Sequence, residues 1–398
     1  MNVVINYQCN CRCDYCFAKP FSSSNPSLYM SVEEYKDILL FLKKSGFSFI
    51  HIFGGEPTLH PDFIELVSYA DKMFRTFFVL TNGFVEKKIT NQLKAFSSAK
   101  YVCNYSARKF STRPEANLDH FLKTLHKSIT LGVTYTGNIS AREIDSWIKT
   151  INGYDLKRLL RFGIASPDCQ RSNKYVDFNK GRRKFNRDLQ LIATKLFKEG
   201  ILLAEDCTSI PLCKLDNDTI ALWKRNFGND IMTRCAPPSD YLPGKMVSSC
   251  FGTASFLVPF SKYKTGQEFQ AYFMRLHQIL ENNIAIKPCS ECDYFKISCF
   301  GGCLSNFIAQ LNPLIFKSHA HRENGHQQWL IYCDNEKTLV MKKNDIDRHF
   351  IFTGIEKMFF DLLMKEPEDM EAIKEDSPEK VLEAYNYIVD QDQNSSGC

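Results

Sequence analysis

The sequence lacks the long apolar run of a membrane-spanning helix, because no stretch approaches roughly 18 consecutive apolar residues. It also lacks a secretory signal, since residues 1–8 contain neither a basic segment nor an apolar run. Charge of one sign never gathers into a block, and 50 Lys and Arg against 45 Asp and Glu leave a net charge of +5. These absences predict a cytoplasmic protein and give no support to a membrane or nucleic-acid partner.

Cysteine, in contrast, is abundant, with 16 in 398 residues. In a reducing compartment so many cysteines indicate metal binding rather than disulfides. The hydrophobic share of 44% and the charged share of 24% are typical of globular domains, which excludes disordered and fibrous classes. The length predicts roughly two to three domains.

The first half of the chain alternates short β-branched or aromatic runs with helical patterns. A capping box formed by Ser31 and Glu34 opens the clearest helix, which is expected to end at Gly46. This alternation predicts a parallel sheet, either open and doubly wound or closed into a partial barrel, with functional side chains at the carboxyl ends of the strands. The six expected strands are 3–7, 47–53, 76–80, 101–105, 133–136 and 159–164.

The pattern changes after residue 200, where the chain becomes rich in loops, proline and cysteine. Eight of the 16 cysteines lie between Cys207 and Cys303, so metal is expected to organise this region. A hairpin at 329–341 and two amphipathic helices at 356–364 and 378–389 follow. The predicted fold is α/β, with a partial (β/α)6 barrel at 1–200, a cysteine-rich domain at 201–333 and a small α+β cap at 334–398.

The first cysteine group follows the first expected strand directly. Cys9, Cys13 and Cys16 are separated by three and two residues, with Cys11 between the first two. Three thiolates on one loop can hold three irons of a cubane cluster and leave the fourth iron open for a small chelating ligand. The alternative is a zinc knuckle that also uses Cys11, although structural zinc sites usually divide their ligands into separated pairs.

Three motifs at successive strand ends resemble those of the radical S-adenosylmethionine (SAM) superfamily. The cysteine spacing, with Tyr15 before the last cysteine, is similar to that family's cluster loop. Phe-Gly-Gly-Glu-Pro at 53–57 is similar to its SAM-binding turn, and Thr-Asn-Gly at 81–83 to another common feature. The resemblance implies a catalytic [4Fe–4S] cluster on Cys9, Cys13 and Cys16. The SAM-binding residues that it implies are Tyr15, Gly54, Gly55, Glu56, Asn82, Ser106, Asn138 and Ser140.

Elementary chemistry agrees with this interpretation of the Gly-Gly-Glu turn. Gly54 and Gly55 let the backbone approach a ligand closely, and Glu56 offers a carboxylate to the ammonium of SAM. Asn82 stands before a glycine, so a simple turn is an equal alternative. Ser106, Asn138 and Ser140 lie near later strand ends, where polar residues are also common without a ligand.

The second cysteine group is Cys289, Cys292, Cys299 and Cys303, preceded by Cys235 and Cys250 on either side of Gly244. It resembles the auxiliary-cluster domain called SPASM, found after many radical SAM cores. Zinc is the alternative, since two close cysteine pairs are also typical of zinc sites, and one auxiliary cluster instead of two remains open. The resemblance implies one cluster on Cys235, Cys250, Cys303 and either Cys213 or Cys207, and a second on Cys289, Cys292, Cys299 and Cys333.

The resemblance implies an enzyme that reductively cleaves SAM to a 5′-deoxyadenosyl radical, which abstracts a hydrogen from a substrate. A ribosomally made peptide or protein is the expected substrate, with a flavodoxin or ferredoxin as reductase. Alternatives are a dehydrogenase or rearrangement enzyme for a small carbohydrate or amino-acid-derived substrate, and a sulfatase-maturase-like enzyme. The last uses an aspartate directly after the second auxiliary cysteine, where this chain has Phe251. The tail faintly resembles small winged-helix modules that bind leader peptides, with a plain helical cap as the alternative.

Overall fold

The computed structural model describes most of the chain, and the statements below concern only the residues that it describes. None of its helices is long and apolar enough to cross a membrane. The described residues are 1–24, 28–168, 172–178, 180–206, 209–227, 233, 235, 239–253, 256–283, 289–295, 297, 299–305, 329–333, 337–342, 345–364, 374–375 and 377–394.

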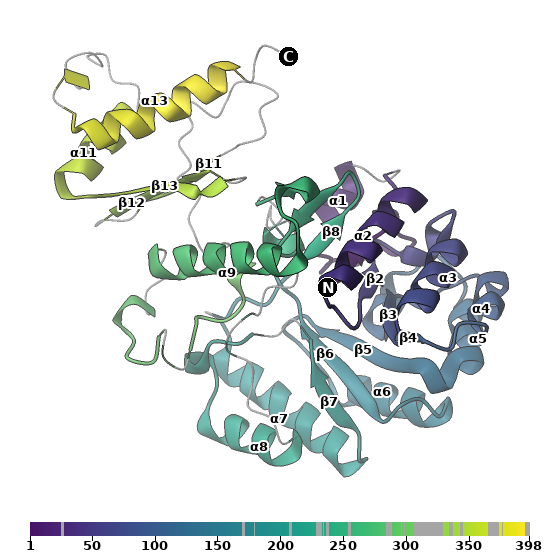
Figure 1. Ribbon diagram of the computed structural model, residues 1–398. Coiled ribbons are helices and arrows are strands. Elements are labelled where there is room, and N and C mark those ends of the chain that lie inside the picture. Colours follow the sequence, from purple (N-terminus) through teal and green to yellow (C-terminus); the bar gives the residue numbers. More distant parts are fainter. Residues whose placement is uncertain are drawn as a thin grey trace.

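A parallel sheet forms the centre of the first domain (Figure 1). Neighbouring strands from β1 to β7 pair in parallel and in chain order. This confirms the predicted α/β fold with a parallel sheet, and β1 to β6 correspond to the six expected strands. The strands are β1 (Asn2–Val4), β2 (His51–Phe53), β3 (Phe77–Thr81), β4 (Ala99–Asn104), β5 (Ile129–Tyr135), β6 (Leu159–Ile164) and β7 (Leu202–Glu205).

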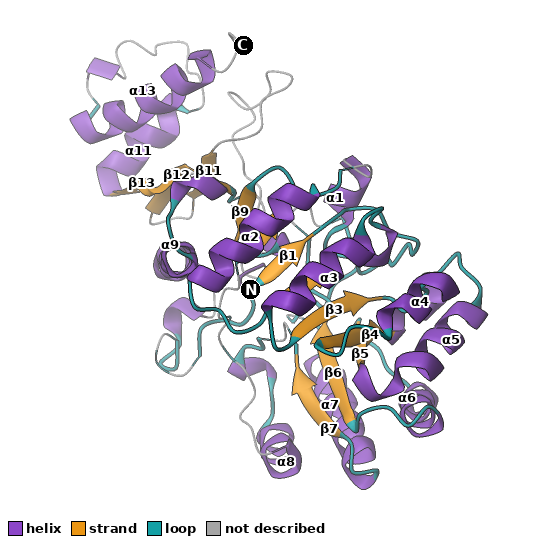
Figure 2. Cartoon of the chain, turned by 45° about the vertical axis from the view of Figure 1, so that its right-hand side comes forward, coloured by secondary structure: helices purple, strands orange, loops and turns teal. Residues whose placement is uncertain are grey.

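Helices cover one face of this curved sheet, as Figures 1 and 2 show. The helix predicted after Ser31 begins there, because the Ser31 side chain accepts a hydrogen bond from the Glu34 backbone N–H. Its apolar face is buried in the main core. The helices are α1 (Lys19–Ser24), α2 (Val32–Lys44), α3 (Phe63–Met73), α4 (Lys87–Leu93), α5 (Glu115–Leu125), α6 (Ala141–Gly153), α7 (Arg182–Lys198) and α8 (Asn217–Phe227).

The two faces of the sheet differ in burial. In β4, Tyr101 and Cys103 are buried in the main core, whereas Val102 and Asn104 alternate with them and are less buried. Successive side chains of a strand point to opposite faces, so the less buried positions face away from the helices. The less buried face of the sheet is therefore available for a functional site next to the carboxyl ends of the strands.

The sheet extends beyond the six expected strands. β8 (Asp240–Leu242) pairs in parallel with β1, and β9 (Met246–Ser248) and β10 (Val258–Pro259) continue antiparallel. The boundary expected at residue 200 falls before β7 and divides this sheet, so we propose that the first domain includes β7. These strands were missed because two to four residues carry too little periodicity to recognise.

The C-terminal cap is a second layer of sheet and helices. Its strands are β11 (Trp329–Cys333), β12 (Lys337–Lys342) and β13 (Asp345–Thr353), all antiparallel. The predicted hairpin is β11 and β12, so the boundary expected after residue 333 divides a sheet. We propose instead that the cap begins at or before Trp329. The helices are α11 (Gly354–Leu363) and α13 (Glu379–Asn394).

The cap lies beside α9 (Gly266–Asn283) in both views (Figures 1 and 2). The Ile346 N–H donates to the Tyr272 hydroxyl at 3.3 Å, and Arg275 pairs with Asp347 at 2.6 Å. Side chains of β12 alternate between two cores. Leu339 and Met341 pack in the main core, and Val340 packs in a separate core with α11 and α13. The cap sheet is thus packed on both faces.

Short 3-10 turns complete the described elements, namely η1 (Pro57–Leu59), η2 (Tyr105–Phe110), η3 (His126–Ser128), η4 (Leu212–Lys214), η5 (Phe251–Thr253), η6 (Phe260–Lys262) and η7 (Cys289–Glu291).

Candidate functional site

The first cysteine group lies on the loop that leaves the carboxyl end of β1. Cys9, Cys13 and Cys16 interact electrostatically with one another, so the loop brings the three sulfurs together. Burial raises the pKa of Cys13 to about 12 and that of Cys16 to about 11. A hydrogen bond with Cys11 lowers the pKa of Cys9. Thiols with raised pKa values must release protons when they bind a metal.

One side of the cysteine loop is held by the segment after β4. The Arg12 N–H donates to the Phe110 carbonyl at 3.1 Å, and the Thr112 N–H donates to the Asn10 carbonyl at 3.2 Å. Cys11 lies between these two contacts and forms a bridge with the same segment. The backbone around Cys11 is therefore used for pairing, while the Cys11 thiol forms a hydrogen bond with Cys9.

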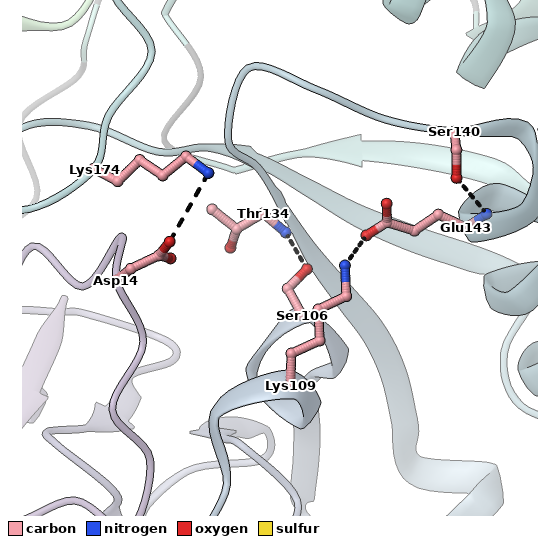
Figure 3. A network of polar contacts seen from close by, with 7 residues as sticks. All are labelled: Asp14, Ser106, Lys109, Thr134, Ser140, Glu143 and Lys174. Atoms are coloured by element: carbon pink, nitrogen blue, oxygen red, sulfur yellow. Dashed lines mark hydrogen bonds and ion pairs between the residues drawn. The ribbon is translucent and has the colours of Figure 1, made fainter.

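The other side of the loop is held by the segment after β6. The Lys174 N–H donates to the Asp14 carbonyl at 2.7 Å, and the side chains of these residues form an ion pair at 3.8 Å (Figure 3). The Asn173 side-chain amide donates to the carbonyl of Tyr15 at 3.1 Å. Tyr15 itself is buried. Sequence reasoning missed these anchors, because contacts between residues so far apart leave no local signal.

Gly54 and Gly55 lie against the chain that leads into the cysteine loop. A Cβ atom would lie 2.3 Å from the Asn6 carbonyl oxygen at residue 54 and 2.3 Å from the Gln8 carbonyl oxygen at residue 55. The Gly55 N–H donates to the Asn6 carbonyl at 3.0 Å. The close approach that glycine permits here is therefore made to the protein backbone, and an additional approach to a ligand stays a prediction.

The Glu56 carboxylate is fully buried and faces other protein groups. It accepts hydrogen bonds from the Thr58 hydroxyl at 2.7 Å, the Thr81 hydroxyl at 2.8 Å and the Asn82 N–H at 2.7 Å. Burial raises the pKa of this carboxyl, against the effect of these hydrogen bonds. Glu56 thus ties the end of β2 to the end of β3, and the implied contact with the ammonium of SAM stays a prediction.

Asn82 both forms a turn and holds the cysteine loop. Its side-chain oxygen accepts from the Phe84 N–H at 3.0 Å, which is the turn role weighed above. Its amide donates to the Asn10 side chain at 2.6 Å and lies 4.0 Å from the Cys9 sulfur. The loop and the ends of β2 and β3 therefore form one connected unit.

The serines named from the sequence have local partners (Figure 3). The Ser106 hydroxyl accepts from the Thr134 N–H at 2.9 Å. Ser140 caps α6, since its hydroxyl accepts from the Glu143 N–H at 3.2 Å. Asn138 is exposed nearby. These positions lie after β4 and β5 as expected, while their contacts with SAM stay a prediction.

Asn104, at the end of β4, is a candidate that sequence reasoning missed. Its amide donates to the Tyr15 hydroxyl at 3.4 Å. Its side-chain oxygen is buried and has no hydrogen-bond partner among the described residues. A buried acceptor without a donor is costly, so this atom fits a ligand that carries a hydroxyl or amine. The signal available in the sequence was its place near the end of the expected strand 101–105.

The later cysteines form two sets. One contains Cys235, Cys250 and Cys303, and the other contains Cys213, Cys289, Cys292 and Cys299, as judged by which thiols interact electrostatically. Among the described residues no three His, Cys, Asp or Glu side chains are arranged to hold a single metal ion. Cys207 lies outside the described residues, and Cys333 belongs to β11, whose side chains are likewise not described.

Comparison with known sequences identifies one family. The sequence model of the Radical SAM superfamily matches residues 3–106. A SAM-dependent nucleotide dehydratase of Selenomonas ruminantium is 38% identical over 84 residues, which are 21% of this chain and 29% of that protein. The GTP 3′,8-cyclase of Mannheimia succiniciproducens is 25% identical over 214 residues, 51% of this chain and 62% of that protein. The subtilosin biosynthesis protein AlbA of Bacillus subtilis is 29% identical over 102 residues, 26% and 22% of the two chains.

Two solved structures share the fold. Native anSMEcpe with bound AdoMet and Cp18Cys peptide aligns with a TM-score of 0.54 at 15% identity, over 76% of this chain and 88% of the other. Streptococcus suis SuiB bound to S-adenosylmethionine aligns with a TM-score of 0.53 at 15% identity, over 78% and 74%. The chain spans less than two thirds of the length of the curated relatives named above.

Proposed function

Because this chain belongs to the radical SAM superfamily, we propose that it is an iron–sulfur enzyme that cleaves SAM reductively and abstracts a hydrogen from a ribosomally made peptide or protein. The observation that carries the proposal is the loop after β1. Three mutually interacting cysteines lie there at the carboxyl edge of a parallel sheet, which is where such folds bind ligands.

The donor set of this loop fits a cubane cluster. Cys9, Cys13 and Cys16 supply three thiolates, and the fourth iron is left for SAM. When bound, the cluster supplies the electron that breaks the sulfonium bond of SAM. Cys11 lies outside this three-ligand spacing. Its backbone pairs with the segment after β4, and its thiol forms a hydrogen bond with Cys9.

Residues around the loop bind and orient the cofactor. We assign to Asn104 the binding of a hydroxyl of SAM, since its buried side-chain oxygen lies beside Tyr15 and accepts no hydrogen bond from a described residue. Glu56 and Asn82 act as positioning residues that hold the loop in place. Orientation of this kind can account for much of the rate of an enzyme.

Aromatic side chains exclude water next to the loop. Phe251 is buried and lies 5.2 Å from the ring of Phe21, 5.6 Å from that of Phe53 and 6.3 Å from that of Tyr7. A phenylalanine in this apolar cluster cannot accept a proton, so the sulfatase-maturase-like alternative has no base at this position. Exclusion of water protects a reactive intermediate from side reactions.

Two observations favour a peptide as substrate. The names of AlbA, a bacteriocin biosynthesis protein, and of anSMEcpe, solved with a peptide, refer to peptides. In the cap, β13 is an edge strand of nine residues that pairs only with β12 among the described strands. An extended peptide can add to such an edge through backbone hydrogen bonds.

A small-molecule substrate is the second candidate. The nucleotide dehydratase and the GTP cyclase are named for nucleotide substrates. These matches span 21% and 51% of this chain. About half of the chain or more therefore lies outside each match.

Anaerobic reconstitution followed by mass analysis tests the proposal. The protein is reduced with dithionite or with flavodoxin, and 5′-deoxyadenosine is measured with and without any short peptide that proves to be encoded beside this chain. A mass change in the co-expressed peptide, together with 5′-deoxyadenosine, supports it. Stoichiometric zinc without acid-labile sulfide would contradict the proposed iron–sulfur enzyme. Efficient turnover of GTP or a sugar would contradict a peptide as the substrate.

A further inference from the structure

The segment 209–213 runs between the two sets of later cysteines and contacts both. At one end, the Cys303 N–H donates to the Ser209 carbonyl at 3.0 Å. At the other end, the Leu212 N–H donates to the Cys299 sulfur at 3.4 Å. Cys213 follows Leu212 directly in the turn η4. The segment therefore places Cys213 beside Cys299.

The thiols that surround Cys213 belong to the same set. Cys213 interacts electrostatically with Cys299 and Cys292, and Cys289 interacts with Cys213, Cys299 and Cys292. A backbone hydrogen bond from Cys292 to the carbonyl of Cys289, at 3.2 Å, closes the loop that carries these two. The four thiols therefore lie near one another, although no three of these described side chains are placed to hold a single metal ion.

Cys303 lies only four positions after Cys299 but points to the other set. Gly301 and Gly302 have φ values of +77° and +89°, a conformation that glycine adopts most readily. A Cβ at residue 302 would lie 2.7 Å from Pro211 and 2.9 Å from the Ser209 carbonyl. The two glycines therefore turn the chain tightly against the segment 209–213 between Cys299 and Cys303.

The other set contains Cys235, Cys250 and Cys303. Cys235 interacts electrostatically with both of the others. Hydroxyl groups support it, since Ser305 lies 3.1 Å from the Cys303 sulfur and Thr253 lies 3.4 Å from the Cys250 sulfur. Hydrogen bonds to cysteine sulfur are one of the ways in which a protein tunes the potential of a cluster.

We propose that Cys213 is the fourth ligand of the cluster on Cys289, Cys292 and Cys299, and that Cys235, Cys250 and Cys303 hold a separate cluster without it. This differs from the assignment implied by the SPASM resemblance, in which Cys213 or Cys207 joins the latter set and Cys333 completes the former. The inference rests on the proposed iron–sulfur function. Cys333 is then dispensable for cluster binding.

Double variants test which cysteines share a cluster. Iron and acid-labile sulfide are measured in anaerobically reconstituted full-length protein carrying Cys213→Ala, Cys299→Ala, Cys303→Ala and their pairs. Each single change is expected to remove about four irons. Cys213→Ala with Cys299→Ala should lose no more than either alone, whereas Cys213→Ala with Cys303→Ala should lose about eight irons. Cys333→Ala is the matched control and should keep all iron.

A spectroscopic measurement covers variants that fold poorly. Serine can replace the sulfur ligand with an oxygen ligand. Cys213→Ser and Cys292→Ser should therefore shift the same EPR signal of the reduced protein, and neither should change the signal that Cys303→Ser shifts. The assignment is overturned if the iron losses of Cys213→Ala and Cys299→Ala add up, or if Cys213→Ser and Cys303→Ser shift the same EPR signal. It is also overturned if Cys333→Ala loses as much iron as Cys213→Ala. A wild-type protein without sulfide would instead overturn the proposed function itself.

Discussion

The carboxylate of Glu56 accepts a hydrogen bond from the backbone N–H of Asn82 at 2.7 Å, which joins the end of β2 to the end of β3. The Asn82 side chain in turn donates to Asn10 within the cysteine loop at 2.6 Å. The Glu56 carboxyl can therefore influence the position of the cysteine loop without contacting a cysteine. This relay separates a structural role of Glu56 from a direct role in binding SAM.

Glu56→Gln is expected to destabilise the first domain. An amide group would point its NH2 either at the Asn82 N–H or at the Thr58 N–H, and a backbone N–H cannot accept a hydrogen bond. The loss of a hydrogen bond to a charged group is worth about 1.5–3 kcal/mol, seen as a lower melting temperature. Glu65→Gln, which breaks only the exposed ion pair with Lys36, is the control and should change little.

SAM affinity distinguishes the two roles of Glu56. If the folded variant binds SAM as tightly as the wild type, Glu56 acts only by positioning. If stability is unchanged while affinity falls by roughly ten- to a hundredfold, the carboxylate contacts the ammonium as the family resemblance implies.

Gly55→Ala should disrupt the cysteine loop. The new Cβ would lie 2.3 Å from the Gln8 carbonyl oxygen, and backbone atoms on both sides leave no flexible group to move. Such overpacking costs about 1–3 kcal/mol or more, and we expect reduced iron content together with a lower melting temperature. Gly153→Ala, with no atom within 4 Å of its Cβ, is the matched control. Full iron content in Gly55→Ala would show that the loop tolerates the displacement.

Replacing Cys9, Cys13 and Cys16 together by alanine should remove about four irons and all SAM cleavage. Cys11→Ala should leave both nearly intact, because residue 11 is outside the three-ligand spacing and its pairing with the segment after β4 uses backbone atoms; the variant removes only its thiol's hydrogen bond with Cys9. Iron analysis and the yield of 5′-deoxyadenosine check both expectations. An essential Cys11 would favour the zinc knuckle or a different set of loop ligands.

Local signals made much of the fold predictable. Ser31 with Glu34 marked a helix start, and runs with β-branched residues marked β1 to β6, because these features depend on neighbouring residues. The short strands β7 to β10 depend on their partners in the sheet, so their sequences alone carry little information.

The site was predictable in its loop positions and less so in its contacts. Glycine 55 was recognised as a point of close approach, but only the fold shows that the approaching group is Gln8. Asn173 and Asn104 escaped notice because their partner, Tyr15, is 158 and 89 positions away. Long-range hydrogen bonds of this kind leave no pattern in a single sequence.

Asp240 predicts a specific pH dependence of stability. Burial raises the pKa of its carboxyl from 3.8 to about 7, although Asn2 donates a hydrogen bond to it at 2.7 Å. The folded state therefore binds more protons than the unfolded state between these values, and its stability falls as pH rises from about 4 to about 7. Asp240→Asn keeps the shape of the side chain without its charge, so this variant should not lose stability in this way. The difference in melting temperature, variant minus wild type, should therefore be a few degrees larger at pH 8 than at pH 5. Asp37→Asn, at an exposed carboxylate, is the control, and a difference for Asp240→Asn that stays constant with pH would show that this carboxyl titrates as an ordinary one.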